Sequence, residues 1–444
     1  MTRDPDEHLA RALAWGCLDA PEWTQRGLVA AGAETLGHRY GWMRQVVRPV
    51  AAAYHRAPVD RPHELARFLL ASTTLLTHTG RARQRGTPVR VRTIALGAAG
   101  PGPRRWPVPP VHDLASLAGL LELPLEQLTW AADTKGLQRR TPPGPLHLYR
   151  YQWVSRPGAV PRLLEAPTPL LRAVLRRTLE GVLRWVPVDP AAHGFVRGRS
   201  ALTNAAAHVG AQTLVCLDLQ TFFATITVAR VKGLFRSMGY PETVAWTLAC
   251  LCTHQKPVAV LSRMPAGGDS SDRHRLRARL RARHLAQGAP TSPALANLAC
   301  VTLDRRLTGY AAAAGLTYTR YADDLAFSGR EVESARLIRV AGTIAREEGF
   351  MINTSKTRVR NAHQRQEVTG LVTNERLGVP RDYHDQLRAV LHDARLHGVV
   401  VANRSGHTHF RAHLDGRVGW VESVNPVRGR RLRADFEAIA WPDR

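Results

Sequence analysis

The sequence predicts an α+β fold in which helical segments flank a small antiparallel sheet. Residues 316–329 contain two β-prone runs, rich in Tyr, Leu and Phe, on either side of the Asp323-Asp324 pair, and they end in Ser-Gly. Such runs are typical of a β-hairpin with the acidic pair at its tip. Residues 214–219 form a short apolar run with a single acid, as expected of a buried strand. Helical spacing of apolar residues is found near both ends of the chain.

The acidic pair at the predicted hairpin tip indicates a metal site. Asp323 and Asp324 are neighbours of like charge, and burial makes their repulsion more costly. A divalent cation relieves this repulsion, and Mg²⁺ prefers oxygen ligands. Asp218, near the end of the predicted strand, is the candidate third ligand, because two-metal enzymes hold their ions between such carboxylates. The alternative is a solvated turn, the ordinary role of an Asp-Asp pair, although apolar strands on both sides weigh against it.

Composition indicates a polyanionic partner. The 444 residues include 62 Lys+Arg against 36 Asp+Glu, a net charge of +26. Basic proteins gain affinity for nucleic acid when neutralised phosphates release counterions, although solubility or attraction to a membrane surface is the alternative. The first residues contain no apolar signal region, and no apolar run is long enough to span a membrane. We therefore expect a cytoplasmic protein with no membrane partner.

The residues of the predicted hairpin also carry a family resemblance. Tyr321-Ala322-Asp323-Asp324, with Asp218 upstream, resembles the palm of reverse transcriptases, and most closely that of bacterial retron reverse transcriptases. The resemblance implies a right-hand polymerase with fingers, an antiparallel-sheet palm and a helical thumb, preceded by a helical extension. The expected division is residues 1–105 for the extension and a basic Pro/Gly linker, 106–375 for fingers and palm, and 376–444 for the thumb.

The same resemblance implies an activity and its partners. The expected reaction is RNA-directed DNA synthesis on a structured non-coding RNA, primed from a 2′-OH of that RNA and operating in anti-phage defence. Asp218, Asp323 and Asp324 would bind two Mg²⁺ ions, with Mn²⁺ as a substitute. The expected partners are the cognate RNA, the RNA–DNA hybrid product, dNTPs and a separate effector protein.

Lys356 and a set of nucleotide-contacting residues complete the expected active site. Lys356 either protonates the departing pyrophosphate, which an arginine could not do, or only neutralises phosphate charge. Phe223, five residues after Asp218, matches the aromatic that excludes a ribose 2′-OH in reverse transcriptases, with a core position as the alternative. By the same resemblance, residues 149–167 form a basic fingers hairpin over the incoming triphosphate, and Arg156 and Arg162 are the candidate contacts, with solvated surface positions as the alternative. The nucleotide-binding candidates are Arg156, Arg162, Phe223, Gln287, Gly288 and Tyr321.

Two short patterns in the sequence resemble those that separate retron enzymes from intron-encoded reverse transcriptases. One is Asn-Ala-x-x-His, which the chain shows at Asn204 and His208, and the other is Val-Thr-Gly. By resemblance they recognise the cognate RNA, whereas buried bracing of the palm is the competing interpretation. The full recognition set is Asn204, His208, Val368, Thr369 and Gly370.

Two other functions compete with this interpretation. A group II intron-like or diversity-generating reverse transcriptase would share the palm but not the two retron patterns. A non-catalytic RNA-binding scaffold would explain the basic charge. A scaffold has no need of Asp218, Asp323 and Asp324, because clustered carboxylates repel phosphates.

Overall fold

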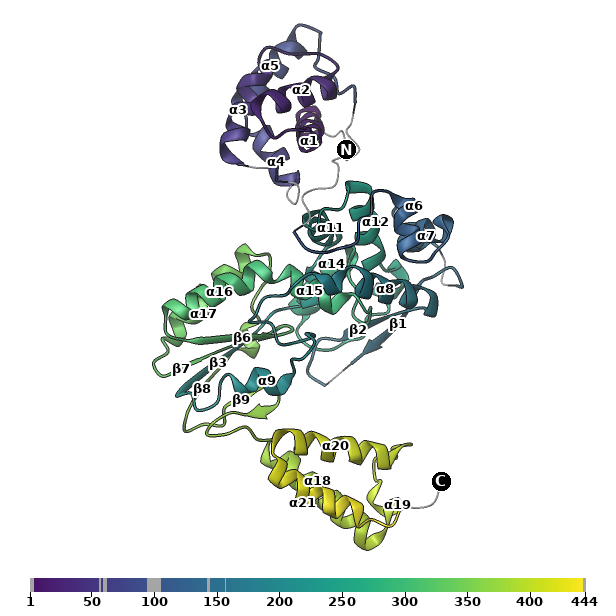
Figure 1. The fold of residues 1–444 in the computed structure, drawn as a ribbon, viewed down its shortest axis with the longest axis vertical. Helices are drawn as coiled ribbons and strands as arrows, with labels where there is room; N and C mark the ends of the chain where they lie inside the picture. The colour runs from purple at the N-terminus through teal and green to yellow at the C-terminus, as the bar shows by residue number, and fades with distance from the viewer. Residues whose placement is uncertain are drawn as a thin grey trace. The chain divides into compact units, whose positions relative to one another are not determined.

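The chain forms helices and short antiparallel sheets that group into two units in the computed structural model (Figure 1). The structure describes residues 4–55, 57–58, 62–93, 105–141, 144–155 and 157–441. The first unit joins the chain up to Pro187 with Phe223–Ala299, and the second joins Val188–Phe222 with the chain from Cys300 onward. Each unit is therefore assembled from two separate stretches of sequence.

Five amphipathic helices form the N-terminal part of the first unit. Their apolar faces share one core that includes Leu13, Leu28, Val47 and Leu65, each at most 1% exposed. Burial of such side chains is the main contribution to helix stability in a small bundle, since isolated helices of this length are marginal in water. The helices are α1 (Pro5–Leu18), α2 (Gln25–Leu36), α3 (Met43–Ala53), α4 (Pro62–Leu70) and α5 (Thr73–Gln84).

The remainder of the first unit combines helices with two small hairpins. β1 (Tyr149–Val154) pairs antiparallel with β2 (Arg162–Pro167) along its whole length, and β4 (Thr253–His254) pairs with β5 (His284–Leu285). Alternate residues of β2 are buried, so Leu163 and Glu165 face the interior. The helices are α6 (Leu114–Leu120), α7 (Leu125–Ala132), η1 (Leu137–Arg139), α8 (Pro169–Gly181), η2 (Leu183–Trp185), α11 (Val228–Ser237), α12 (Glu242–Cys252), α13 (Val258–Ser262), α14 (Ser270–Arg281) and α15 (Ser292–Ala299), and α10 (Phe222–Thr225) begins at the unit boundary.

A four-stranded antiparallel sheet is the centre of the second unit. Its strand order is β6-β7-β3-β8, so β3 is an inner strand between β7 and β8. Apolar residues of β3 are almost fully buried, as predicted for the run that ends in Asp218. The strands are β3 (Thr213–Asp218), β6 (Thr317–Tyr321), β7 (Asp324–Gly329) and β8 (Arg358–Asn361), accompanied by α16 (Val301–Ala313), α17 (Ser334–Glu347) and η3 (Thr354–Lys356).

A second core joins the sheet to the C-terminal helices of this unit. It includes Leu214 of β3, Leu387 of α18, Leu414 of α20 and Leu432 of α21, each at most 2% exposed. A two-stranded hairpin also contributes to this core and lies beside α9. The elements are α9 (Ala201–Ala206), β9 (Glu367–Val368), β10 (Leu371–Val372), α18 (Arg381–His397), α19 (Val399–Ala402), α20 (Phe410–Val424) and α21 (Pro426–Glu437), and Figure 1 draws α18–α21 in yellow.

The predicted α+β fold, with its antiparallel sheet and helical ends, is confirmed. Asp113 caps α6 through a capping box with Ser116. The two units divide the chain by contacts, at other positions than residues 105 and 375. The predicted division into extension, fingers and palm, and thumb therefore stays a prediction. Within the described part of the chain, no helix is both long enough and apolar enough to cross a bilayer.

Candidate active site

Two of the three predicted acids lie side by side on neighbouring strands of the central sheet. Asp218 is the last residue of β3, and Asp324, the first residue of β7, is its direct partner in the antiparallel register. Directly opposite residues point to the same face with Cβ atoms about 5 Å apart. Asp218 is 8% exposed, whereas Asp324 is exposed. The pair therefore combines one buried and one solvent-facing carboxylate on a single face.

The predicted hairpin is present, and its loop has two residues. β6 and β7 pair so that Tyr321 lies opposite Asp324, which leaves Ala322 and Asp323 as the turn. Ala322 has φ 58°, in the left-handed region that few residues other than glycine adopt. This conformation reverses the chain at once, and it places Asp323 beside the first residue of β7.

Neighbouring backbone holds this turn from two sides. The amide of Leu219, next to Asp218, donates to the carbonyl of Asp323 at 2.9 Å. On another side, a Cβ on Gly194 would lie 2.5 Å from the nitrogen of Ala322, so only glycine permits the observed approach. These contacts bring Asp323 close to Asp218 and complete the group of three predicted acids.

Lys356 also reaches this group. It ends η3, the short helix before β8, and its Nζ donates to Oδ1 of Asp218 at 2.7 Å. The amide of Asn353 donates to the carbonyl of Asp218 at 2.7 Å, which fixes η3 against the end of β3. The Lys356 side chain is 51% exposed, so its ammonium is open to a ligand from solvent while it offsets the charge of Asp218.

The donors of this site suit Mg²⁺. No set of three His, Cys, Asp or Glu side chains within the described ranges is arranged closely enough to hold a metal ion by itself. Mg²⁺ is usually bound by one or two carboxylates together with substrate phosphates and water. The opposed pair of Asp218 and Asp324, with Asp323 beside it, supplies carboxylate oxygens of that kind. The residues present thus fit a substrate-assisted magnesium site.

Gln287 and Gly288 lie in the first unit, against β2. The amide of Glu165 donates to the carbonyl of Gln287 at 2.9 Å, and a Cβ on Gly288 would lie 2.9 Å from the Glu165 carbonyl. Gly288 has φ 130°, so the loop combines an unusual backbone with a close approach. Arg162, at the start of the same strand, is exposed. The structure thus places the candidates Gln287 and Gly288 against the strand that carries Arg162.

A fully buried ionic network holds that strand. Nζ of Lys256 lies 3.0 Å from Oε1 of Glu165 and 3.0 Å from Nε2 of His284, and none of the three side chains is more than 2% exposed. Burial raises the pKa of Glu165, but the Lys256 ammonium and His284 outweigh it and lower this pKa to about 2. Because β5, which contains His284, leads directly into Gln287, the network fixes both sides of the loop.

The other nucleotide-binding candidates that the structure describes, Phe223 and Tyr321, belong to different units. Phe223 is half-buried in α10 of the first unit, whereas its neighbour Phe222 packs on Phe350 in the core of the second unit, with ring centroids 5.9 Å apart. Tyr321 belongs to the second unit, and its ring lies 6.4 Å from that of Phe195. Arg156 lies outside the described residues. The predicted roles of these residues stay predictions.

The two retron patterns are far apart in sequence but adjacent in space. α9, which contains Asn204, packs against β9 and β10. Thr369 and Gly370 form the turn between these strands, with φ 49° and 79°, which is the type I′ pattern. The Thr369 hydroxyl donates to the carbonyl of Ala201 at 3.0 Å, so it ties this turn to the first residue of α9. Val368 is 3% exposed and Gly370 is exposed.

His208 and Asn204 are both buried, at 1% exposure each. The two ring nitrogens of His208 lie 2.7 Å from the hydroxyls of Ser328 on β7 and Thr319 on β6. Both nitrogens are therefore engaged within the protein, which favours the bracing alternative for His208 over direct contact with RNA. Gly370 at the hairpin turn is the part of the two patterns that faces solvent.

We expect His208→Ala to lower the free energy of unfolding by about 3 kcal/mol, because two buried hydroxyls lose their partner. Burial, and to a lesser degree the nearby His193, lower the pKa of His208 from 6.5 to about 4. The folded state thus keeps the ring neutral while the unfolded state gains a proton. The contribution of the neutral His208 ring to the free energy of unfolding is therefore complete above pH 6.5, and it is lost as pH falls toward 4. Urea unfolding between pH 7.5 and 4 should show a weaker pH dependence in the variant, and an unchanged dependence would contradict the bracing role.

Comparison with known proteins places these features in a family. Residues 159–373 match the family described as reverse transcriptase (RNA-dependent DNA polymerase). The retron Mx65 reverse transcriptase of Myxococcus xanthus is 43% identical over 292 residues, covering 64% of this chain and 63% of that protein. The retron Mx162 reverse transcriptase of the same organism is 36% identical, covering 73% of this chain and 66% of that protein.

A more distant relative is covered more fully. The retron Ec86 reverse transcriptase of Escherichia coli is 29% identical over 326 residues, covering 72% of this chain and 87% of that protein. The chain spans slightly less than two thirds of the length of each of the two Myxococcus relatives. The segment that matches the family, residues 159–373, contains β2 and the sheet that carries Asp218 and Asp323. The fold is that of a right-hand polymerase, and the chain is similar to bacterial retron-type reverse transcriptases over this segment.

Proposed function

We propose that this chain is an RNA-directed DNA polymerase that adds deoxynucleotides to a hydroxyl of a nucleic-acid primer. The observation that supports it best is the register of the central sheet. That register sets Asp218 opposite Asp324 and beside Asp323, with the Lys356 ammonium 2.7 Å from Asp218. A cluster of acids next to a solvent-open cation suits a phosphoryl-transfer site, in which the protein mainly positions groups and balances charge.

Each residue of this cluster has a distinct role in the proposed reaction. Asp218 and Asp323 would hold two Mg²⁺ ions, with Asp324 in support and Mn²⁺ as a substitute. When bound, such ions lower the pKa of the attacking hydroxyl and stabilise the leaving oxygen. Lys356 holds its proton at Nζ, 2.7 Å from Asp218, where it can neutralise or protonate a departing pyrophosphate.

The template and biological setting are proposed from the family. We propose a structured non-coding RNA as template, a 2′-OH of that RNA as primer, and a role in anti-phage defence with a separate effector protein. The RNA–DNA hybrid and dNTPs are the remaining partners, and a cytoplasmic location stays a prediction. Among the residues of the retron patterns, the solvent-facing turn at Thr369 and Gly370 is the better candidate for RNA contact.

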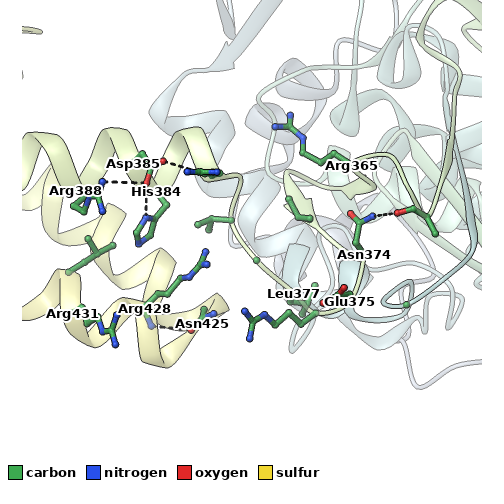
Figure 2. A pocket seen from close by; sticks show the side chains of 18 of the residues that line it. Arg365, Asn374, Glu375, Leu377, His384, Asp385, Arg388, Asn425, Arg428 and Arg431 are labelled. Carbon is green, nitrogen blue, oxygen red and sulfur yellow. Dashed lines mark hydrogen bonds and ion pairs between the residues drawn. The ribbon is translucent and has the colours of Figure 1, made fainter.

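A basic pocket in the second unit supports an RNA partner. It measures about 1260 Å³ and is bounded by the loop after β10, by α18 and by the start of α21, as Figure 2 shows from close by. Guanidinium groups suit phosphate because they offer several donors in one plane. Six arginines outnumber the three acids in its lining, which are Arg365, Arg376, Arg381, Arg388, Arg428 and Arg431 against Glu375, Asp385 and Asp435.

Some of these arginines are already balanced by acids. Asp385 lies within 3.9 Å of both Arg381 and Arg388. Within the described ranges, Arg376, Arg428 and Arg431 form no salt bridge, and all three are exposed at the pocket. These three guanidinium groups are therefore the ones most available to RNA phosphates, and Arg428 and Arg431 are neighbours on α21.

We expect Arg428→Ala with Arg431→Ala to weaken binding of structured RNA about tenfold at physiological salt. The loss should be similar for unrelated RNAs, and the salt dependence should decrease by about one unit of slope per lost phosphate contact. Filter binding across a salt series measures both quantities. Arg336→Ala, an exposed arginine of α17, is the control and should leave the slope unchanged. An unaltered slope in the double variant would show that the pocket does not contact RNA phosphates.

The sugar preference gives a separate prediction. Phe223→Ala or Phe223→Val should admit ribonucleotides, because an aromatic at this offset from Asp218 would exclude a 2′-OH by shape. We expect the selectivity for dNTP over rNTP to fall by at least tenfold, or about 1.4 kcal/mol. Competitive incorporation of dGTP and rGTP measures it. Unchanged selectivity in an active variant would show that Phe223 has only a packing role.

Primer extension tests the proposed function against the scaffold alternative. The purified chain is supplied with an RNA template, an annealed primer, Mg²⁺ and labelled dNTPs, and RNA binding is measured on the same preparation. The proposal predicts extension. Binding without extension, on both generic RNA and RNA that co-purifies with the chain, would favour a non-catalytic scaffold.

A further inference from the structure

A buried ion pair adjoins the hairpin that carries Asp323. Arg320 of β6 and Asp304 of α16 have 0% exposed side chains. Nε of Arg320 donates to Oδ1 of Asp304 at 2.8 Å, and Nη2 donates to Oδ2 at 2.6 Å. The Tyr318 hydroxyl donates to Oδ1 of Asp304 at 2.9 Å. The carboxylate thus accepts three hydrogen bonds, and the guanidinium is fixed by a two-point fork.

The fork leaves one guanidinium nitrogen directed at the turn. Nη1 of Arg320 donates to the carbonyl of Ala322 at 3.0 Å. Ala322 is the residue with φ 58°, and its carbonyl belongs to the peptide that leads into Asp323. A non-glycine residue in this region costs on the order of 1 kcal/mol and persists only where neighbours hold it. Arg320 provides such a contact from the interior.

The backbone of Arg320 is itself anchored. Its amide donates to the carbonyl of Ala191 at 2.8 Å, and its carbonyl accepts from the amide of His193 at 2.7 Å. The side chain therefore extends from a fixed main chain, with Asp304 setting its orientation. Any displacement of Asp304 would be passed through the fork to the Ala322 carbonyl.

Stability alone does not explain this arrangement. Replacing a buried ion pair by apolar side chains of similar volume is often neutral or stabilising, because the charges lose their hydration on burial. An apolar contact between α16 and β6 would hold these elements together equally well. It would offer no hydrogen bond to the Ala322 carbonyl, which is the feature that distinguishes the ion pair.

We propose that Arg320 and Asp304 are positioning residues that set the geometry of the metal-binding carboxylates through the Ala322 carbonyl. The inference rests on the proposed polymerase function. Neither residue touches substrate in this proposal, and both act through the turn. Lysine could not replace Arg320 fully, because one ammonium cannot reproduce the planar fork and also reach Ala322.

The test uses an apolar version of the network in the full chain. The triple variant Arg320→Met, Asp304→Leu, Tyr318→Phe removes both charges and the Tyr318 hydroxyl, and it takes the Arg320 hydrogen bond away from the Ala322 carbonyl. We expect its melting temperature to stay within about 4 °C of the parent. We expect kcat to fall about 100-fold, because small misplacements of catalytic groups have effects of this size. The KM for dNTP and the affinity for RNA should change little.

Metal dependence separates positioning from a merely structural role. The Mg²⁺ concentration for half-maximal synthesis should rise about tenfold in the triple variant, as is typical when residues that orient metal ligands are replaced. Mn²⁺ binding to the RNA-free protein, followed by electron paramagnetic resonance, should weaken in parallel. Arg306→Met is the matched control, since Arg306 lies on the same helix and pairs with Glu347 and Glu348 at the surface. It should alter none of these quantities.

Two results would overturn the inference. One is a folded triple variant with parental kcat and metal dependence. If the triple variant does not fold, the Arg320→Lys variant is measured in its place. Its kcat should fall about tenfold, and its Mg²⁺ requirement should rise. Parental values of both quantities in Arg320→Lys would also overturn the inference. Absence of DNA synthesis by the parent chain would instead refute the proposed function, and the Mn²⁺ measurement would still decide the positioning role.

Discussion

Asp323→Asn is expected to reduce DNA synthesis by at least about 1,000-fold, corresponding to about 4 kcal/mol of lost transition-state stabilisation. The amide keeps the shape of the side chain but removes the negative charge that would hold a metal ion. The turn should persist, because its contacts with Leu219 and Arg320 are made by the backbone of Asp323 and Ala322. RNA affinity should stay within about twofold, since a carboxylate near phosphates adds no attraction.

The measurement is single-turnover primer extension, with filter binding on the same preparation. Asp272→Asn is the matched control, since Asp272 lies in the first turn of α14 and pairs with Arg275. It should leave both activities unchanged. Primer extension by the Asp323→Asn variant at the parental rate would show that Asp323 is not a metal ligand.

Lys256→Met is expected to lower the free energy of unfolding by about 3 to 5 kcal/mol, because it leaves the Glu165 carboxylate buried without its cation. In the parent chain, the pKa of Glu165 is lowered from 4.5 to about 2. Its contribution to stability is therefore complete above pH 4.5 and is lost as pH falls toward 2. Without Lys256, burial instead favours the protonated form. The difference in free energy of unfolding between the parent and the Lys256→Met variant should therefore decrease as pH falls below 7.

Urea unfolding at pH 7.5 and 5 tests this prediction. The double variant Lys256→Met, Glu165→Leu removes both charges and should recover much of the loss. Lys135→Met, at an exposed lysine, should have no effect beyond about 0.5 kcal/mol. A loss below 1 kcal/mol in Lys256→Met would mean that the network contributes little to stability.

Local features of the fold could be predicted from the sequence. The hairpin around Asp323 consists of two aromatic and apolar strands joined by a short turn. The strands and the turn can both be predicted, because the residues that specify them are close in sequence. The cap of α6 likewise depends on Asp113 and Ser116, three positions apart. The helix α14 was harder to predict, because arginines at alternate positions fit a strand face as well as a basic helix.

Long-range partners could not be predicted from residue patterns alone. His208 bonds to Ser328, 120 residues away, and to Thr319, 111 residues away, and no periodicity encodes those contacts. The same holds for the fork between Arg320 and Asp304, which join a strand and a helix. Arg320 directly precedes the Tyr-Ala-Asp-Asp motif, but nothing in the neighbouring sequence indicates its contact with Asp304. The sequence offers one signal for the network around Glu165. Lys256 is one of only four lysines in an arginine-rich chain.

The most direct measurement of the proposed function is the sequence of the DNA that this chain makes on a defined RNA. The parent protein, the Asp323→Asn variant and a reaction without template are incubated with Mg²⁺ and dNTPs, and the products are sequenced after RNA digestion. RNA-directed polymerisation predicts DNA complementary to the supplied RNA from the parent alone. No product from the parent, or a product that is independent of the template or equal in the variant, would contradict it.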